Sequence, residues 1–186
     1  MSKDKRPWIA LFSQTGSEIV DIADSLGRWP EVIITNKRPE DLRTVNPRLQ
    51  AMHFYDNAQV IEVSNKPTEK ELDTIFEKYN NPVITLHGWL RIMPESLCNK
   101  YEMYNGHPGL ITKYPELKGK DPQVRAFEAK HEVAGCVLHK VTPGVDEGKV
   151  LMEEKFNTWE LELNELFLIL KDRSLYMWTK FLRKVL

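Results

Sequence analysis

The first half of the chain alternates short apolar runs with amphipathic stretches, and this alternation restricts the possible folds more than any other feature. Short apolar runs are typical of strands buried on both faces, and strands that alternate with helices are typical of a parallel sheet. The sequence therefore predicts an α/β fold with a mainly parallel sheet and helices on both of its faces. The pattern comprises Trp8–Phe12, a helical stretch at Ser17–Leu26, Val32–Ile34, Ala51–Tyr55, Val60–Ile61, a helix at Thr68–Tyr79 and Pro82–Leu86.

Two of the expected helices carry clear signals. Thr68 precedes Glu71 by three residues, which is the spacing of a capping box, and an apolar face follows it. Near the C-terminus, apolar residues recur at helical spacing and cations gather in the last turn, where a helix dipole favours them. This pattern predicts a closing helix at about 161–185. Because 186 residues without repeats or long linkers suit one core, we expect residues 1–186 to form a single catalytic domain.

Composition argues against several classes of partner. Lys and Arg number 26 against 27 Asp and Glu, so no global field attracts nucleic acid or anionic lipid. The longest apolar run, Leu166–Leu170, is too short to cross a bilayer, and no secretory signal is evident. We therefore expect a cytoplasmic protein with a small-molecule partner.

The cysteines and most of the histidines suggest no reactive or metal site. Cys98 and Cys136 are interpreted as packing residues, and the spacing of His53, His87 and His131 is not that of a metal site, so no metal is expected.

The segment Tyr101–Pro115 is the richest in reactive groups. Asn105 and His107 are separated by one residue, so in an extended strand both side chains point to the same face. An amide can donate to an oxyanion, and an imidazole can donate or shuttle protons, a pair that suits acyl transfer. The alternative is a turn Asn beside a surface His, since such a short pattern often arises by chance.

A second segment, Gly135–Val150, reads as a strand, a turn-rich loop and another strand. The loop carries Asp146 and Glu147, and a carboxylate placed there could orient an imidazole from another strand and raise its pKa. His139 is expected to support this loop. A Cys136–His139 nucleophile is disfavoured because residues three apart on a strand point to opposite faces.

Three segments together resemble the folate-dependent formyltransferases, the group of glycinamide ribonucleotide transformylase and the methionyl-tRNA formyltransferase catalytic domain. These segments are Asn105–Pro115, Val141–Val150 and Leu86–Pro94, and the likeness runs loosely from Trp8 to about Phe156. The resemblance implies the Rossmann-like formyltransferase fold. It also implies 10-formyltetrahydrofolate as the formyl donor and a small-molecule amine as the acceptor.

The resemblance also assigns residues. It implies Asn105, His107 and Asp146 as the catalytic residues. The reduced folate would lie in a pocket formed by Leu86, Trp89, Leu90, Arg91, Ile92, Val141 and Val145.

Departures from the family pattern fall on the acceptor side. Gly109 stands where the family usually has Ser, and Thr112 where it often has Pro, although neither change removes a catalytic group.

The first βα turn is similar to the transformylase loop that holds a substrate phosphate, and Glu18 stands where that loop has Asn. A carboxylate repels phosphate. The alternative is a plain helix start, with Ser17 as the N-cap and Glu18 favouring the dipole. The expected acceptor-binding residues are Thr15, Gly16, Ser17 and Glu18.

Several functions fit these motifs. The first is formyl transfer to the amine of a small, possibly phosphorylated acceptor, such as a nucleotide, a ribonucleotide or an amino sugar. The alternatives are hydrolysis of 10-formyltetrahydrofolate and a non-catalytic module that binds folate or a nucleotide. A transferase acting on tRNA normally carries a further C-terminal domain, whereas this chain ends soon after its closing helix, which disfavours tRNA. The sequence does not indicate an oligomeric state.

Overall fold

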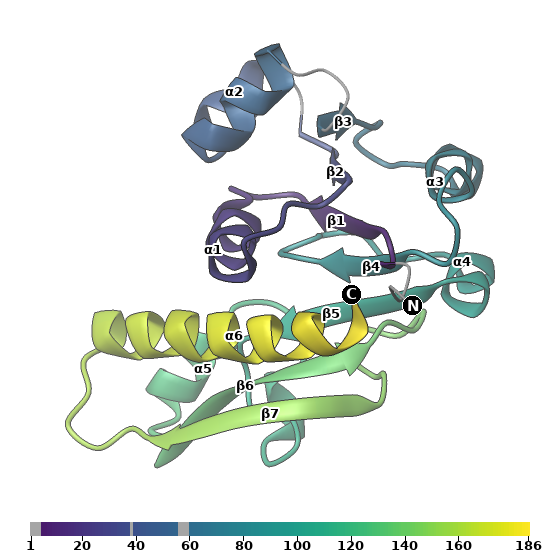
Figure 1. Ribbon diagram of the computed structural model, residues 1–186. Coiled ribbons are helices and arrows are strands. Elements are labelled where there is room, and N and C mark those ends of the chain that lie inside the picture. The colour runs from purple at the N-terminus through teal and green to yellow at the C-terminus, as the bar shows by residue number, and fades with distance from the viewer. Residues whose placement is uncertain (1–4, 38, 56–59) are drawn as a thin grey trace.

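A computed structural model describes residues 5–37, 39–55 and 60–186, and within these residues one seven-stranded sheet forms the centre of the protein (Figure 1). The strand order is β3-β2-β1-β4-β5-β6-β7. The first five strands in this order pair in parallel, whereas β6 is antiparallel to β5 and β7 is antiparallel to β6. The strands are β1 Trp8–Phe12, β2 Val32–Thr35, β3 Val60–Glu62, β4 Val83–Leu86, β5 Glu102–His107, β6 Val133–Lys140 and β7 Val150–Asn157.

Helices cover both faces of the sheet, which confirms the predicted fold class. Helices α1 and α6 contribute to the hydrophobic core on one face, and α3 and α4 contribute to the core on the other. No helix in the described part of the chain is long and apolar enough to cross a membrane. The helices are α1 Ser17–Leu26, α2 Pro47–Tyr55, α3 Glu69–Phe76, α4 Glu95–Lys100, α5 Pro122–Glu128 and α6 Leu163–Val185, with 3₁₀ turns at Pro39–Thr44 and Pro115–Leu117.

Strand β1 shows why the apolar runs of the sequence are continuous. Its five residues are all buried, because Trp8 and its alternate neighbours face the core beside α1 and α6, while Ile9 and Leu11 face the core beside α3 and α4. A strand covered on both faces has no position for a polar side chain directed to solvent.

One apolar run of the sequence is not a strand. The stretch Ala51–Tyr55 forms the second half of helix α2.

The helix starts differ from the sequence prediction in one respect. The Thr68 hydroxyl accepts a hydrogen bond from the Glu71 N–H at 3.2 Å, as a capping box requires. The predicted return bond is wrong, because the Glu71 carboxylate instead accepts from the N–H and the hydroxyl of Ser64, both at 2.7 Å. A complete capping box occurs on α6, between Glu162 and Glu165. The closing helix expected at about 161–185 is observed at Leu163–Val185.

Helix α6 packs closely against strand β5. Trp178 of this helix is fully buried, and a Cβ atom added at Gly106 would lie 2.6 Å from the Trp178 Nε1 atom. Gly106 separates Asn105 from His107, so the residue between them must be small for the strand to lie on the helix. The packing of α6 thereby positions the part of β5 that carries both polar side chains.

Replacing Gly106 with Ala is expected to lower the free energy of unfolding by about 1–3 kcal/mol, the usual effect of overpacking a core. Trp178→Phe removes the atom nearest to the new methyl group, so the double variant should lose less stability than the sum of the two single variants. Urea denaturation of the four proteins measures both effects. A stable Gly106→Ala protein, or additive losses, would contradict this account of the packing.

Candidate functional site

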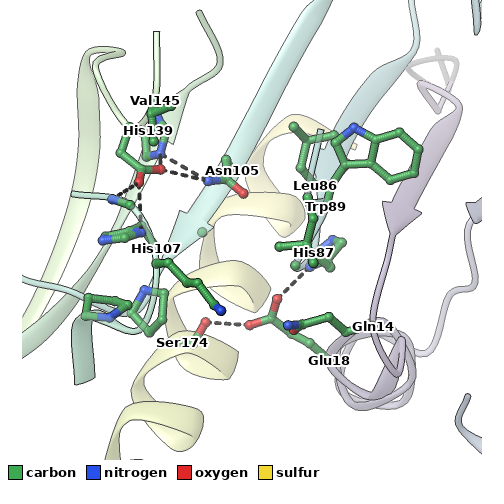
Figure 2. A pocket seen from close by; sticks show the side chains of 18 of the residues that line it. Gln14, Glu18, Leu86, His87, Trp89, Asn105, His107, His139, Val145 and Ser174 are labelled. Atoms are coloured by element: carbon green, nitrogen blue, oxygen red, sulfur yellow. Dashed lines mark hydrogen bonds and ion pairs between the residues drawn. The ribbon is translucent and has the colours of Figure 1, made fainter. Parts of the chain in front are cut away.

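A cavity of about 770 Å³ lies at the carboxyl ends of β1, β4 and β5, and residues of α6 and of the segment 141–146 complete its wall. In open α/β sheets this edge is the usual place for ligands. All the catalytic, folate-binding and acceptor-binding residues expected from the sequence line this one cavity. Figure 2 shows representatives of each group around the same space.

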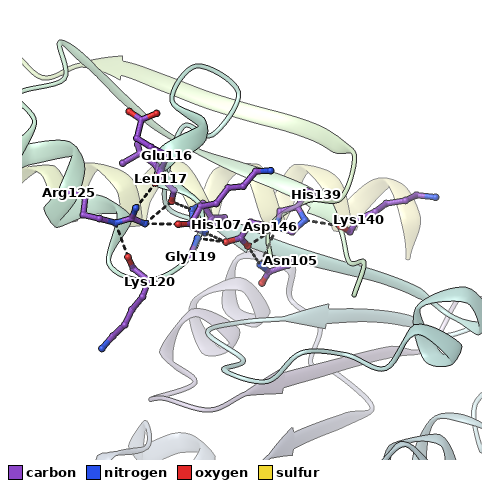
Figure 3. A network of polar contacts seen from close by, with 11 residues as sticks. Asn105, His107, Glu116, Leu117, Gly119, Lys120, Arg125, His139, Lys140 and Asp146 are labelled. Atoms are coloured by element: carbon purple, nitrogen blue, oxygen red, sulfur yellow. Dashed lines mark hydrogen bonds and ion pairs between the residues drawn. The ribbon is translucent and has the colours of Figure 1, made fainter. Parts of the chain in front are cut away.

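The carboxylate of Asp146 is the centre of a polar cluster in this cavity (Figure 3). Its Oδ2 atom lies 3.2 Å from His107 Nδ1 and accepts a hydrogen bond of 2.9 Å from the Gly119 N–H. Its Oδ1 atom lies 3.3 Å from His139 Nε2 and accepts from Asn105 Nδ2 at 3.4 Å. The structure thus brings together Asn105, His107 and Asp146, and adds His139 as the expected support of the loop.

Strand pairing and loop geometry explain this convergence. The antiparallel register of β5 and β6 places Asn105 opposite His139, and on the other side of β6 the register with β7 shifts at Leu138/His139. His139 Nδ1 donates to the Lys140 carbonyl at 2.7 Å, which fixes the ring so that its Nε2 atom lies 3.2 Å from Asn105 Nδ2 and 3.3 Å from Asp146 Oδ1. The loop after β6 folds back against this strand. A side chain at Gly148 would overlap the Lys140 carbonyl, so only Gly permits this approach.

Asp146 is buried, yet it is held in its charged form. Burial would raise the pKa of this carboxyl group, but the contacts with His139, His107 and the Gly119 N–H outweigh burial and keep the pKa below its ordinary value. Asp146 is therefore ionised at neutral pH and can orient the imidazole of His107.

His107 behaves differently from the sequence prediction. Burial lowers the pKa of His107, and the opposing effects of Asp146 and of the Leu117 carbonyl, which lies 2.8 Å from Nε2, do not reverse that shift. Asp146 does raise the pKa of His107, as expected, but burial lowers it by more. The predicted direction of the overall shift is therefore wrong. The ring is 5% exposed, so desolvation of the cation dominates.

The absence of a side chain at Gly109 leaves space for the imidazole ring of His107. A Cβ atom at position 109 would lie 2.9 Å from His107 Nε2 and 2.8 Å from the Cβ atom of Pro122. The departure from the family Ser at this position therefore affects the surroundings of His107. A Ser side chain here would require His107 or Pro122 to move.

One half of the cavity is apolar. Leu90, Ile92 and Val145 line it with exposed fractions of 57%, 68% and 52%, which is unusual for large apolar side chains and typical of a ligand surface. Leu86 and Trp89 are buried in the core behind this surface, and Val141 is partly buried there. The Arg91 guanidinium donates to the Asn65 backbone carbonyl at 2.8 Å and to its side-chain oxygen at 2.6 Å, which fixes the position of the segment.

The other half, around the start of α1, is polar. Gly16, with φ of 71°, is the N-cap residue, and the Thr15 hydroxyl accepts from the Ser17 N–H at 3.2 Å. The alternative in which Ser17 caps the helix is therefore wrong, because Ser17 is its first residue. The Glu18 carboxylate accepts a hydrogen bond of 2.7 Å from His87 Nδ1 and one of 2.6 Å from the Ser174 hydroxyl (Figure 2).

Sequence reasoning missed His87 and Ser174. The sequence indicates for His87 only that it lacks metal-site spacing, although its position directly after the buried strand β4 is a signal that its side chain can reach the sheet edge. Ser174 lies 156 residues from Glu18, and no local pattern connects them.

Cys136 is buried on the opposite face from His139, as expected, and burial, with Glu18 and Glu154 nearby, raises the pKa of its thiol to about 12. This thiol is consequently unreactive.

The sheet order and the polar cluster at the strand ends define an α/β protein with a ligand site at the carboxyl edge of its sheet. Residues 9–165 match the Formyl transferase family, and the chain belongs to this family. The chain is 30% identical over 166 residues to the human trifunctional purine biosynthetic protein adenosine-3, which covers 82% of this chain and 15% of that protein. It is 31% identical over 94 residues to the Escherichia coli phosphoribosylglycinamide formyltransferase, covering 50% of this chain and 43% of that enzyme.

Solved structures share the fold. Glycinamide ribonucleotide transformylase 1 from Symbiobacterium toebii aligns with a TM-score of 0.79 at 19% identity, covering 98% of this chain and 88% of that one. A formyltetrahydrofolate deformylase from Pseudomonas syringae aligns with a TM-score of 0.77 at 18% identity, covering 98% and 61%. The chain spans about 15% of the length of the trifunctional relatives it matches.

The electrostatics of the cluster predict how His107 titrates. Its pKa should lie below the ordinary value, and Asp146→Asn should lower it further because the variant removes the charge that favours the imidazolium. NMR titration of isotope-labelled histidine measures both values. Because the folded-state pKa of His107 is depressed, its contribution to stability is present above the unfolded pKa and is lost as the pH falls. A pKa of His107 that rises in Asp146→Asn would contradict the arrangement.

Proposed function

We propose that this chain transfers a formyl group from 10-formyltetrahydrofolate to the amine of a small acceptor, with Asn105, His107 and Asp146 as its catalytic residues. One observation carries the proposal: these three side chains contact one another in a single cavity that is also lined by exposed apolar side chains and by the polar start of α1. Membership of the Formyl transferase family, and relatives named as phosphoribosylglycinamide formyltransferases, support this chemistry. The cavity is lined by residues from Gln14 to Ser174, which favours a single catalytic domain.

The apolar half suits the folate donor. The flat pterin ring can cover the exposed side chains of Leu90, Ile92 and Val145, which would remove apolar surface from water. The backbone of residues 141–146 would close over the ring from the other side. The formyl group would then lie beside Asn105 and His107, at the inner end of this half.

The reaction begins when the uncharged acceptor amine attacks the formyl carbon. A carbon–nitrogen bond forms, and negative charge develops on the formyl oxygen. Asn105 Nδ2 carries two hydrogens, so it can contact Asp146 and also donate to this oxygen. His107 would donate as well once its Nε2–H group turns from the Leu117 carbonyl to the formyl oxygen. Preorganised donors in a buried site stabilise such charge without reorganisation of water.

The reaction ends with proton transfer and cleavage. The bond between the formyl carbon and N10 of the folate breaks, and the proton lost by the attacking amine is delivered to N10. Burial lowers the pKa of His107, so its imidazolium is a stronger acid than an exposed one and a better donor to the departing nitrogen. Asp146, ionised at neutral pH, would orient this ring and relay the proton, directly or through water.

Hydrolysis is the second candidate, with water in place of the amine. The fold likeness to a formyltetrahydrofolate deformylase makes it necessary to test. The polar half of the cavity, lined by Gln14, Glu18 and Ser174, offers space and hydrogen-bonding groups for an acceptor larger than water, and this favours transfer. Incubation with 10-formyltetrahydrofolate, with and without candidate amines, separates transfer, hydrolysis and binding without turnover.

Asn105→Ala is expected to lower kcat by about 10²–10³-fold, the usual loss when one oxyanion donor is removed. Tetrahydrofolate binding and the circular dichroism spectrum should remain unchanged. Asn157→Ala, an exposed position at the end of β7, serves as the matched control and should retain full activity. Turnover of Asn105→Ala at the wild-type rate would refute the assigned role.

Ile92→Ser is expected to weaken folate binding by about tenfold, since burying an apolar side chain under a ligand contributes roughly 1.5–3 kcal/mol when burial is complete. Because Ile92 is exposed in the free protein, the stability should hardly change. Leu168→Ser is the control, for Leu168 is 63% exposed on α6 and does not line the cavity. Fluorescence titration with tetrahydrofolate measures the affinities, and equal values for the two variants would exclude the apolar surface as the pterin site.

A further inference from the structure

We infer that the polar half of the cavity selects an acceptor whose far end carries an ammonium group or another hydrogen-bond donor, and that it rejects a phosphate there. The inference rests on the proposed function, since it assigns this half to the acceptor. Its basis is the carboxylate of Glu18, which lines the cavity in a fixed position.

A buried chain of hydrogen bonds fixes one side of this carboxylate. Trp8 Nε1 can only donate, and it lies 2.8 Å from the Thr85 hydroxyl oxygen. That hydroxyl lies 2.8 Å from His87 Nε2, much closer than its other acceptor, the Ile9 carbonyl at 3.5 Å. The hydroxyl therefore donates to His87 Nε2, which places the ring hydrogen on Nδ1, from where it is donated to Glu18 Oε2 at 2.7 Å.

This direction of hydrogen bonding has a consequence for charge. His87 is satisfied as a neutral imidazole, because it accepts through one nitrogen and donates through the other. The negative charge of Glu18 is then oriented by His87 without being cancelled by it.

The second oxygen of the carboxylate is held by another element. The Ser174 hydroxyl, on helix α6, donates to Glu18 Oε1 at 2.6 Å. The Glu18 side chain remains 35% exposed, and Figure 2 shows its carboxylate between Ser174 of α6 and the His87 side chain. Burial would raise the pKa of Glu18, but the hydrogen bonds from His87 and Ser174 hold it below the ordinary value, so the group is ionised at neutral pH.

The cations around the cavity do not offset this charge. Lys171 Nζ lies 3.0 Å from Asp21 Oδ2, and Lys120 Nζ lies 3.8 Å from Asp121 Oδ2, so each is already beside a carboxylate of the chain. The Arg91 guanidinium also lines the cavity, in its apolar half, and donates to oxygens of Asn65 and Leu90. The start of α1 favours an anion, and Glu18 in the first turn supplies one from within the protein. A phosphate entering this half would meet a fixed carboxylate, whereas an ammonium or hydroxyl group would find an acceptor with free lone pairs.

Three amines with the same four-carbon chain provide the test: 1,4-diaminobutane, 4-aminobutan-1-ol and 4-aminobutyl phosphate. They differ only in the far group, which is cationic, neutral or anionic. The wild-type protein should use the diamine with the highest kcat/KM and the phosphate with the lowest. In Glu18→Gln, kcat/KM for the diamine should fall by about tenfold, the usual size of a charged hydrogen bond, and the value for the phosphate should rise. The ratio of variant to wild type for each amine cancels differences in amine basicity.

Controls separate this inference from the proposed function. Asp172→Asn removes a negative charge from an exposed position of α6 that does not line the cavity, and it should leave all three values unchanged. Unchanged tetrahydrofolate affinity of Glu18→Gln shows that the donor half is intact. Calorimetric binding of the three amines to protein saturated with tetrahydrofolate supplies a readout independent of turnover.

The outcomes are distinguishable. Formyl transfer with the phosphate preferred, or with no change in Glu18→Gln, would overturn the inference and leave the proposed function standing. Binding in the order diamine, alcohol, phosphate, without formyl transfer or hydrolysis, would overturn the proposed function. It would at the same time retain the polar half as a cation-selective site.

Discussion

The carboxylate of Asp146 is the interaction on which the arrangement of the site depends. It accepts a hydrogen bond from the Gly119 N–H in one loop and contacts His107 at the end of β5 and His139 in β6. Three separate parts of the chain therefore share one charge. Because the group is buried, it must be stabilised by all of these contacts, and their loss would leave an unpaired charge in the core. The same contacts hold the imidazole of His107 in one orientation.

Two close approaches make this geometry possible. Gly106 lets strand β5 lie directly on Trp178 of α6, and Gly109 leaves space for His107 beneath Pro122. Both positions lie within the segment that carries the candidate catalytic groups. Here glycine is required by the neighbouring side chains, because native cores have no spare volume for a further methyl group.

A second carboxylate, Glu18, forms an independent polar centre in the same cavity. Asp146 contacts His107 and His139, whereas Glu18 is bonded to His87 and to a hydroxyl of α6. The two carboxylates differ in surroundings: Asp146 is 10% exposed, whereas Glu18 is 35% exposed. A deeply buried carboxylate suits the orientation of a catalytic group, and a more accessible one suits contact with a ligand. The cavity has an apolar half, where Leu90 and Ile92 follow strand β4, and a polar half, where Glu18 lies in the first turn of α1.

The sequence alone determined the fold class and most of the buried strands, because burial on both faces of a parallel sheet demands continuous apolar runs such as Trp8–Phe12. It also determined that Asn105 and His107 share one face, since a strand has a period of two residues. Tertiary structure decided what no local pattern contains: the net direction of the His107 pKa shift, which depends on burial, and the partners of Glu18. His87 and Ser174 are far from Glu18 in sequence, and only the packing of α1, β4 and α6 brings them together.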